Sequence, residues 1–160
     1  MNEEKRFSLL EAHREFARIT NNQVWDLLEK PAHKTIDEEE MLLAANTSLY
    51  HWLQVGTAVN AQRGHWLLSR VYIVLGRPQN AVEHALKCQE ITENNPKEMQ
   101  DYDLAFAQET LARAYASIGD QDKARDYLKK AEKLGQAIQD KDDKEIFAGD
   151  LNSGEWYGIK

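Results

Sequence analysis

Two segments of this 160-residue chain carry the same residues at the same spacing. The shared residues are Leu68, Tyr72, Gly76 and Ala81 in the first copy, and Leu111, Tyr115, Gly119 and Ala124 in the second. The copies are 43 residues apart, and small or apolar residues continue each of them at helical intervals. A unit of two helices cannot bury its own apolar face, so such units must stack on one another. The sequence therefore predicts a stack of helix pairs.

The composition agrees with a folded, helical protein. Hydrophobic residues make up 42% and charged residues 29%, which is typical of a globular domain and not of a disordered chain. The chain has only 8 glycines and 3 prolines, which favours long helices over the many turns of an all-β fold. The net charge of −7 argues against nucleic acid as a partner, because binding to phosphate backbones is driven by excess Lys and Arg.

Cysteine and histidine usage limits the chemistry of the chain. Cys88 is the only cysteine, so no internal disulfide can form, and a reducing cytoplasm fits best. The five histidines show no His-x3-His pair and no Glu-x2-His motif, so we expect no metal and no cofactor. The first residues include acids, and no continuous apolar run follows them, so we expect neither a secretory signal nor a membrane span. These features predict a cytoplasmic protein.

Periodicity and capping signals predict seven helices. We expect the first five at about residues 3–29, 36–55, 59–75, 78–92 and 96–118, a sixth after the turn at Gly119-Asp120, and a short seventh at about 142–151. A capping box of Thr35 and Glu38 is expected to begin the second helix. Asn95-Pro96 is expected to begin the fifth, because it supplies a cap and a proline for the first turn.

Residues 66–76, followed by Ala81, and residues 111–120, followed by residues 124–131, resemble tetratricopeptide repeats. The offset of 43 residues exceeds the usual period of about 34, as in the longer-helix type of this family. The resemblance implies an all-α fold: a right-handed superhelical stack of antiparallel helix pairs. We expect a single domain over residues 1–160, with a divergent helix pair (1–58), a first repeat (59–95), a second repeat (96–140), and a C-terminal cap and tail (141–160).

The resemblance also implies a function, namely a non-enzymatic scaffold that binds a protein or peptide in a groove. In such repeats the first helix of each pair lines the groove. Counting from Tyr72 and Tyr115, the groove residues would be Arg63, Trp66, Arg70, Phe106, Glu109 and Arg113. Arg70 and Arg113 are equivalent in the two copies, and guanidinium groups bind carboxylates bidentately. Alternatively, these arginines pair with Glu109 or with acids on neighbouring helices.

A second interpretation places a small-molecule sensor at the junction of the second and third helices. Aromatic and imidazole side chains concentrate there, and His51, Trp52 and Trp66 would line the pocket. The same residues could instead form the core between the divergent pair and the first repeat.

A remote alternative is a ribonuclease of the HEPN type. Arg77 and His84, separated by six residues, resemble the Arg-x4-6-His signature of that family, in which the two side chains act on a phosphate. Pro78 follows Arg77, where the family has a polar residue, and the acidic net charge does not favour RNA.

Two questions about contacts remain open at the level of sequence. Trp156 and Tyr157 follow the last predicted helix, and they either dock on it or contact a partner. Self-association into a homodimer that extends the stack is also conceivable, because only two clear repeats are present.

Overall fold

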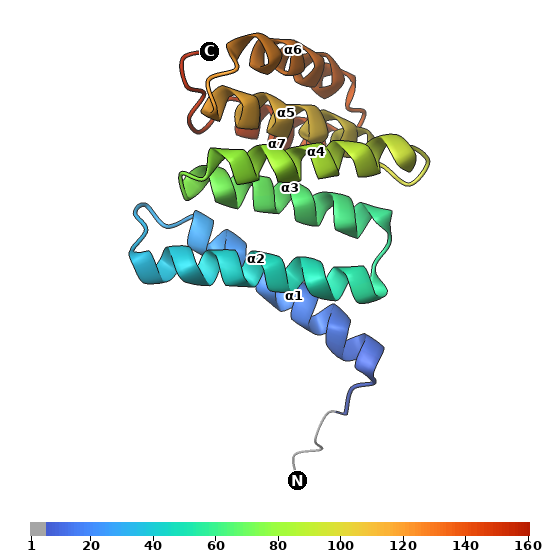
Figure 1. Cartoon of the computed structure of the whole chain (residues 1–160). Helices are drawn as coiled ribbons and strands as arrows, with labels where there is room; N and C mark the ends of the chain where they lie inside the picture. Colours follow the sequence, from blue (N-terminus) through green and yellow to red (C-terminus); the bar gives the residue numbers. More distant parts are fainter. Residues whose placement is uncertain (1–5) are drawn as a thin grey trace.

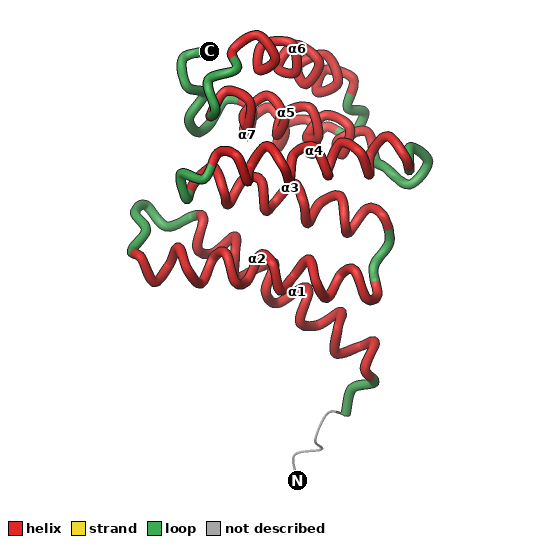
Figure 2. Tube along the Cα trace, viewed as in Figure 1, coloured by secondary structure: helices red, strands yellow, loops and turns green. Residues whose placement is uncertain are grey.

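The computed structural model describes residues 6–160, and this part of the chain folds into seven helices without a strand (Figures 1 and 2). The helices are α1 (Leu9–Leu28), α2 (Thr35–Val55), α3 (Ala58–Val74), α4 (Pro78–Asn94), α5 (Asp101–Ser117), α6 (Gln121–Ala137) and α7 (Lys141–Leu151). The predicted all-α fold with about seven helices is confirmed for the described residues.

The first six helices form three antiparallel hairpins that stack in chain order (Figure 1). Each hairpin packs on the next, with α2 against α3 and α4 against α5, while α3 also contacts α5. The helix α7 then packs on α5 and α6 and covers the last hairpin. This is the arrangement that the repeated segments predict: consecutive hairpins lying side by side in the same orientation.

The repeated tyrosine and glycine end the first helix of each repeat in the same way. After α3, the Arg77 amide donates to the Tyr72 carbonyl at 2.8 Å and the Gly76 amide donates to Ile73 at 3.1 Å. The same two bonds recur after α5. Both bonds belong to the Schellman motif, which needs a left-handed residue, and Gly76 and Gly119 have φ angles of 64° and 84°.

The repeated alanines let the helices of each hairpin approach closely. Ala81 and Ala124 are completely buried. The tyrosines pack in equivalent places, since Tyr72 stacks on His84 and Tyr115 stacks on Tyr127, with ring centroids 5.4 and 5.6 Å apart. The sequence repeat is therefore also a repeat of contacts.

Acids at positions not expected from the sequence cap three of the helices. Residues 95–100 form turns, and α5 begins only at Asp101, where Asp103 accepts a hydrogen bond from the Gln100 amide at 2.9 Å. For α2 the capping acid is Asp37, which accepts from the Lys34 amide at 2.9 Å, and not Glu38. The helix α1 begins at Leu9, after a capping box of Ser8 and Glu11. The earlier predicted residues 3–5 lie outside the described residues.

The C-terminal residues close the stack. The Trp156 ring is 7% exposed in a core with Ile138, Phe147 and Leu151, and its indole N–H donates to the Leu151 carbonyl at 3.1 Å. Tyr157, by contrast, remains 37% exposed. Docking of the tail, one of the two interpretations above, is therefore correct for Trp156.

Candidate functional site

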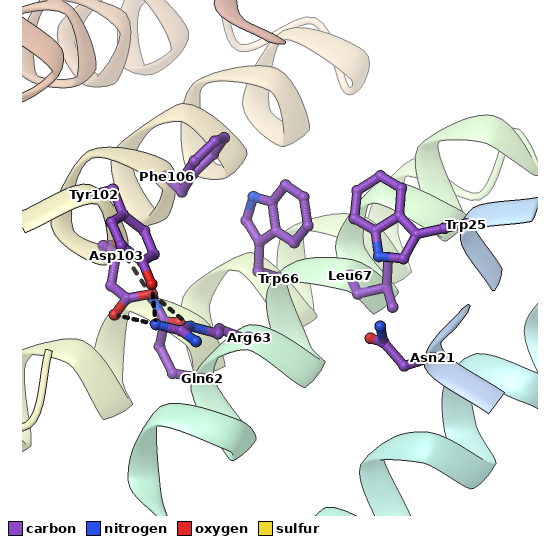
Figure 3. A pocket seen from close by; sticks show the side chains of 9 residues that line it. All are labelled: Asn21, Trp25, Gln62, Arg63, Trp66, Leu67, Tyr102, Asp103 and Phe106. Atoms are coloured by element: carbon purple, nitrogen blue, oxygen red, sulfur yellow. Dashed lines mark hydrogen bonds and ion pairs between the residues drawn. The ribbon is translucent and has the colours of Figure 1, made fainter. Parts of the chain in front are cut away.

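Three aromatic rings from three successive hairpins lie next to one another. Trp25 on α1 contacts Trp66 on α3, with ring centroids 5.7 Å apart, and Trp66 meets Phe106 on α5 edge-on at 5.3 Å (Figure 3). All three rings are only partly buried. We call these three residues the aromatic row. Because α1, α3 and α5 are the first helices of their hairpins, the row runs along the side of the stack where the resemblance places a groove.

A first hollow of about 270 Å³ opens beside the aromatic row. Its remaining lining comes from Asn21, Gln62, Arg63, Leu67, Tyr102 and Asp103 (Figure 3). Arg63 donates to both carboxylate oxygens of Asp103, from Nε at 2.8 Å and from Nη2 at 3.0 Å, and Nη2 also donates to the Tyr102 hydroxyl at 2.7 Å. The polar wall of this hollow is thus fixed by hydrogen bonds between α3 and α5.

A second hollow of about 450 Å³ lies on the side of α7 and shares all three rings of the row. Glu145, Ile146, Gly149, Asp150 and Ser153 supply its other wall. We call the two hollows together the aromatic groove.

Arg70 ties the row to α7. Its Nη1 and Nη2 lie 2.7 and 2.6 Å from the carboxylate oxygens of Asp150, and its guanidinium carbon lies 5.9 and 5.6 Å from the ring centroids of Trp25 and Trp66. The ion pair therefore holds one edge of the groove in place, while the cation lies over the two indoles.

Glu109 and Arg113 are buried and line neither hollow of the groove. This corrects the expectation that they line it. Their exposed fractions are only 2% and 6%. Arg113 donates to Glu109 at 2.5 Å and to the carbonyls of Ser153 and Asp150 at 2.9 and 3.1 Å, and its guanidinium lies 4.0 Å from the Trp156 ring centroid. The C-terminal segment therefore covers both side chains.

Burial raises the pKa of the Glu109 carboxyl, while the neighbouring Arg113 guanidinium acts in the opposite direction. The predicted arginines thus follow the second of the two alternatives: Arg63, Arg70 and Arg113 each form an ion pair with an acid of this chain. Each of these guanidinium groups is therefore already paired with a carboxylate of the chain itself.

The sequence analysis missed several residues of the groove, among them Trp25, Tyr102 and Ile146. Trp25 belongs to the apolar stripe of the first helix, but no repeat signal in that helix indicates which side faces inward. Tyr102 lies in the first turn of α5, and Ile146 lies on α7, whose position depends on tertiary contacts. The spacing within the two repeats does not locate residues on α1 and α7, which lie outside them.

The structure does not bring the three residues of the alternative pocket into one hollow. His51 turns towards α1, where its Nδ1 lies 2.7 Å from Nδ1 of His13. Trp52 lines another hollow with Arg18 and Asn60, whereas Trp66 belongs to the aromatic row.

The two residues of the nuclease pair have different surroundings. His84 is half-buried, with its Nδ1 2.9 Å from Nδ1 of His65 and its ring stacked on Tyr72. Arg77 is exposed at the turn before α4 and lines a separate hollow with Leu42 and Leu75. Within residues 6–160, no group of three or more His, Cys, Asp or Glu side chains is placed to hold a metal ion. No helix of this same part of the chain is long and apolar enough to cross a membrane.

The stacked hairpins and the groove along their first helices define an α-helical repeat protein. A comparison with family models identifies the repeat: residues 63–95 and 107–134 match the tetratricopeptide repeat. The chain thus contains two tetratricopeptide repeats, which cover less than half of its length and coincide with the two predicted copies. Neither the search of curated proteins nor the search of solved structures gave a match. Repeats of this family suggest a scaffold for protein–protein interaction in general.

Proposed function

We propose that this protein is a non-enzymatic cytoplasmic scaffold whose aromatic groove binds a segment of a protein partner through apolar side chains. The observation that carries this proposal is the aromatic row, in which three rings from three hairpins meet and remain partly open to hollows on both sides. Large aromatic side chains are the usual energetic anchors of binding surfaces.

The charged residues around the row are suited to holding its shape. Arg63 is fixed by Asp103 and Tyr102, and Arg70 is fixed by Asp150. A groove whose walls are already ordered loses less conformational entropy when a ligand binds. Of the six groove residues expected from sequence, we therefore assign partner contact to Arg63, Trp66 and Phe106, which line the hollows. Arg70, Glu109 and Arg113 line neither hollow, and their ion pairs support the shape of the groove.

Selection of peptides from a random displayed library tests this proposal and does not require the partner to be identified first. We expect enriched peptides to share aromatic or aliphatic residues, because the row offers ring faces. Ile146→Glu places a charge in the second hollow at a side chain that is 63% exposed, so the fold should remain intact while peptide affinity falls at least tenfold. Leu86→Glu is the matched control, since Leu86 is 45% exposed on α4, outside both hollows.

Two outcomes would contradict the proposal. One is enrichment of peptides whose affinity is equal for wild type and Ile146→Glu. The other is a library that yields no binding sequence at all. A protein that bound a small molecule instead would show an increased melting temperature in a metabolite screen and no peptide selectivity.

A further inference from the structure

The side of α7 that faces the aromatic groove is acidic. Glu145, Ile146, Gly149 and Asp150 of this helix line the second hollow. Asp142 lies three residues before Glu145 and four before Ile146, so it continues the same side of the helix by one turn. This side of α7 therefore carries the carboxylates of Asp142, Glu145 and Asp150, whereas neither lysine of α7 lines either hollow.

The two lysines of α7 neutralise little of this charge. Lys144 points to another side of the helix, where its Nζ donates to the Gln136 carbonyl at 2.6 Å. Lys141 Nζ lies 3.7 Å from Glu145, but the two side chains are 86% and 69% exposed, and such an ion pair contributes little. In the described part of the chain, no side chain donates a hydrogen bond to the Asp142 carboxylate. The carboxylates of Asp142 and Glu145 are thus open to a cation from a partner.

Further carboxylates gather where α7 begins. Partial desolvation raises the pKa of the Asp143 carboxyl, and repulsion from neighbouring carboxylates raises it further. These neighbours are Asp140, Asp101 and Asp142, and Arg63 acts in the opposite direction. Asp140 caps the helix, since it accepts from the amides of Asp142 and Asp143 at 2.9 and 3.0 Å. The excess of negative charge therefore extends along α7 from the second hollow to the first turn.

The other charges that line the groove are balanced within the chain. Arg63 pairs with Asp103, and Arg70 pairs with Asp150. The open carboxylates of α7 consequently set the sign of the electrostatic potential in the second hollow. A cleft with charges of one sign concentrates the field and attracts ligands of the opposite sign.

The rings of the aromatic row favour the same kind of ligand. Trp25, Trp66 and Phe106 all line the second hollow, and the faces of aromatic rings attract cations. Arg70 is an example within the chain, because its guanidinium carbon lies 5.9 and 5.6 Å from the ring centroids of the two tryptophans. A Lys or Arg side chain has an apolar stem, which packs on rings, and a cationic end, which pairs with carboxylates.

We propose that the segment bound in the aromatic groove carries Lys or Arg next to an apolar residue. The apolar residue contacts the aromatic row and Ile146, and the cationic group pairs with Asp142 and Glu145. This inference rests on the proposed function of the groove and adds the charge of the partner. Salt weakens the binding, because exposed charges are screened.

Two displayed peptide libraries test the charge of the partner with the full chain. Both encode random apolar residues, to which one library adds only Lys and Arg and the other only Asp and Glu. We expect binders from the basic library. Their affinity should fall about fivefold in Asp142→Asn with Glu145→Gln, because two exposed ion pairs are lost. It should also fall when NaCl is raised from about 0.05 to 0.5 M.

Asp122→Asn with Asp126→Asn is the matched control for the acidic side of α7. This double variant also removes two exposed carboxylates near the start of a helix, but α6 lines neither hollow. It should bind the basic peptides as wild type does, and circular dichroism should be the same for both double variants. An equal loss of affinity in the two double variants overturns the proposal, because net charge would then explain the binding.

Ile146→Asn separates this inference from the proposed function, because it removes the apolar contact without a change in charge. Suppose that binders lose affinity in Ile146→Asn but come equally from the acidic library, or bind equally to Asp142→Asn with Glu145→Gln. That result overturns the basic partner and leaves the groove in place. Binders that are unaffected by Ile146→Asn overturn both proposals, as do two libraries that yield no binder.

Discussion

The C-terminal cap offers a quantitative test of how the stack is stabilised. Trp156 is buried against Ile138, Phe147 and Leu151, and its ring lies beneath the Arg113 guanidinium at 4.0 Å. The substitution Trp156→Ala removes this ring, and it also removes the apolar cover of a buried ion pair between Arg113 and Glu109. We expect the last hairpin to lose much of its protection from solvent.

The expected loss follows from the burial of the ring. Replacement of a core Trp or Phe by Ala costs about 3–5 kcal/mol, and a segment at the end of the ordered chain can relax, so we expect the lower end, about 3 kcal/mol. For a chain of this size, each kcal/mol lowers the melting temperature by about 2–4 °C, so the expected decrease is about 6–12 °C. Tyr157→Ala is the matched control, because this neighbouring ring is 37% exposed, and it should cost less than about 1 kcal/mol.

Thermal and urea unfolding, followed by circular dichroism at 222 nm, measure both variants. Hydrogen exchange locates the effect, and faster exchange should be confined to α5, α6 and α7. Equal losses for Trp156→Ala and Tyr157→Ala would refute the account of the cap, as would a loss spread evenly over all three hairpins.

Further predictions concern other parts of the stack. Burial is the main cause that lowers the pKa of His65 from 6.5 to about 4. The neutral imidazole is thus the folded form, and its contribution is present above pH 6.5 and lost as the pH falls towards 4. After allowance for partial solvent exposure we expect this loss to be about 1–2 kcal/mol, and urea unfolding at pH 7 and 4.5 should show that much less acid destabilisation in His65→Gln. Gly119→Ala should lower the free energy of unfolding by about 1 kcal/mol, since φ there is 84°, whereas Gly149→Ala, on a helix with open space around it, should be neutral or stabilising in the same assay. Cys88 is fully buried, and burial raises the pKa of its thiol, so a disulfide reagent at pH 8 should label the protein only after denaturation; rapid labelling of the native chain would contradict its burial.

The sequence predicted the parts of the fold that local rules determine. Tyr72, Gly76 and Ala81 recur 43 residues later because they meet local requirements. The glycine allows the Schellman motif that ends the helix, and the alanine allows the two helices of the hairpin to approach closely. The start of α5 was predicted wrongly, because Asn95-Pro96 and Asp103 both offer capping chemistry, and tertiary contacts select the second. Arg63 illustrates that choice, since it pairs with Asp103 across the hairpins.

The site was predicted only where it repeats. Trp66 and Phe106 follow from positions relative to the two tyrosines, and both line the groove. Glu109 and Arg113 occupy equally suitable positions by spacing, yet the C-terminal segment covers them. The docking of a nonrepeated tail depends on contacts over about 40 residues of sequence, such as that between Arg113 and Ser153, and no periodic pattern encodes it.

The most direct test of the aromatic groove uses the four tryptophans as reporters. In a ¹H–¹⁵N spectrum each indole N–H gives one signal, and Trp25, Trp52, Trp66 and Trp156 are assigned by single substitutions to phenylalanine. When a selected peptide is added, the signals of Trp25 and Trp66 should shift together with one saturation curve. The Trp156 signal should remain in place, because its N–H is buried and donates to Leu151. A peptide that binds while the Trp25 and Trp66 signals stay fixed would contradict the claim that the aromatic row is the binding surface.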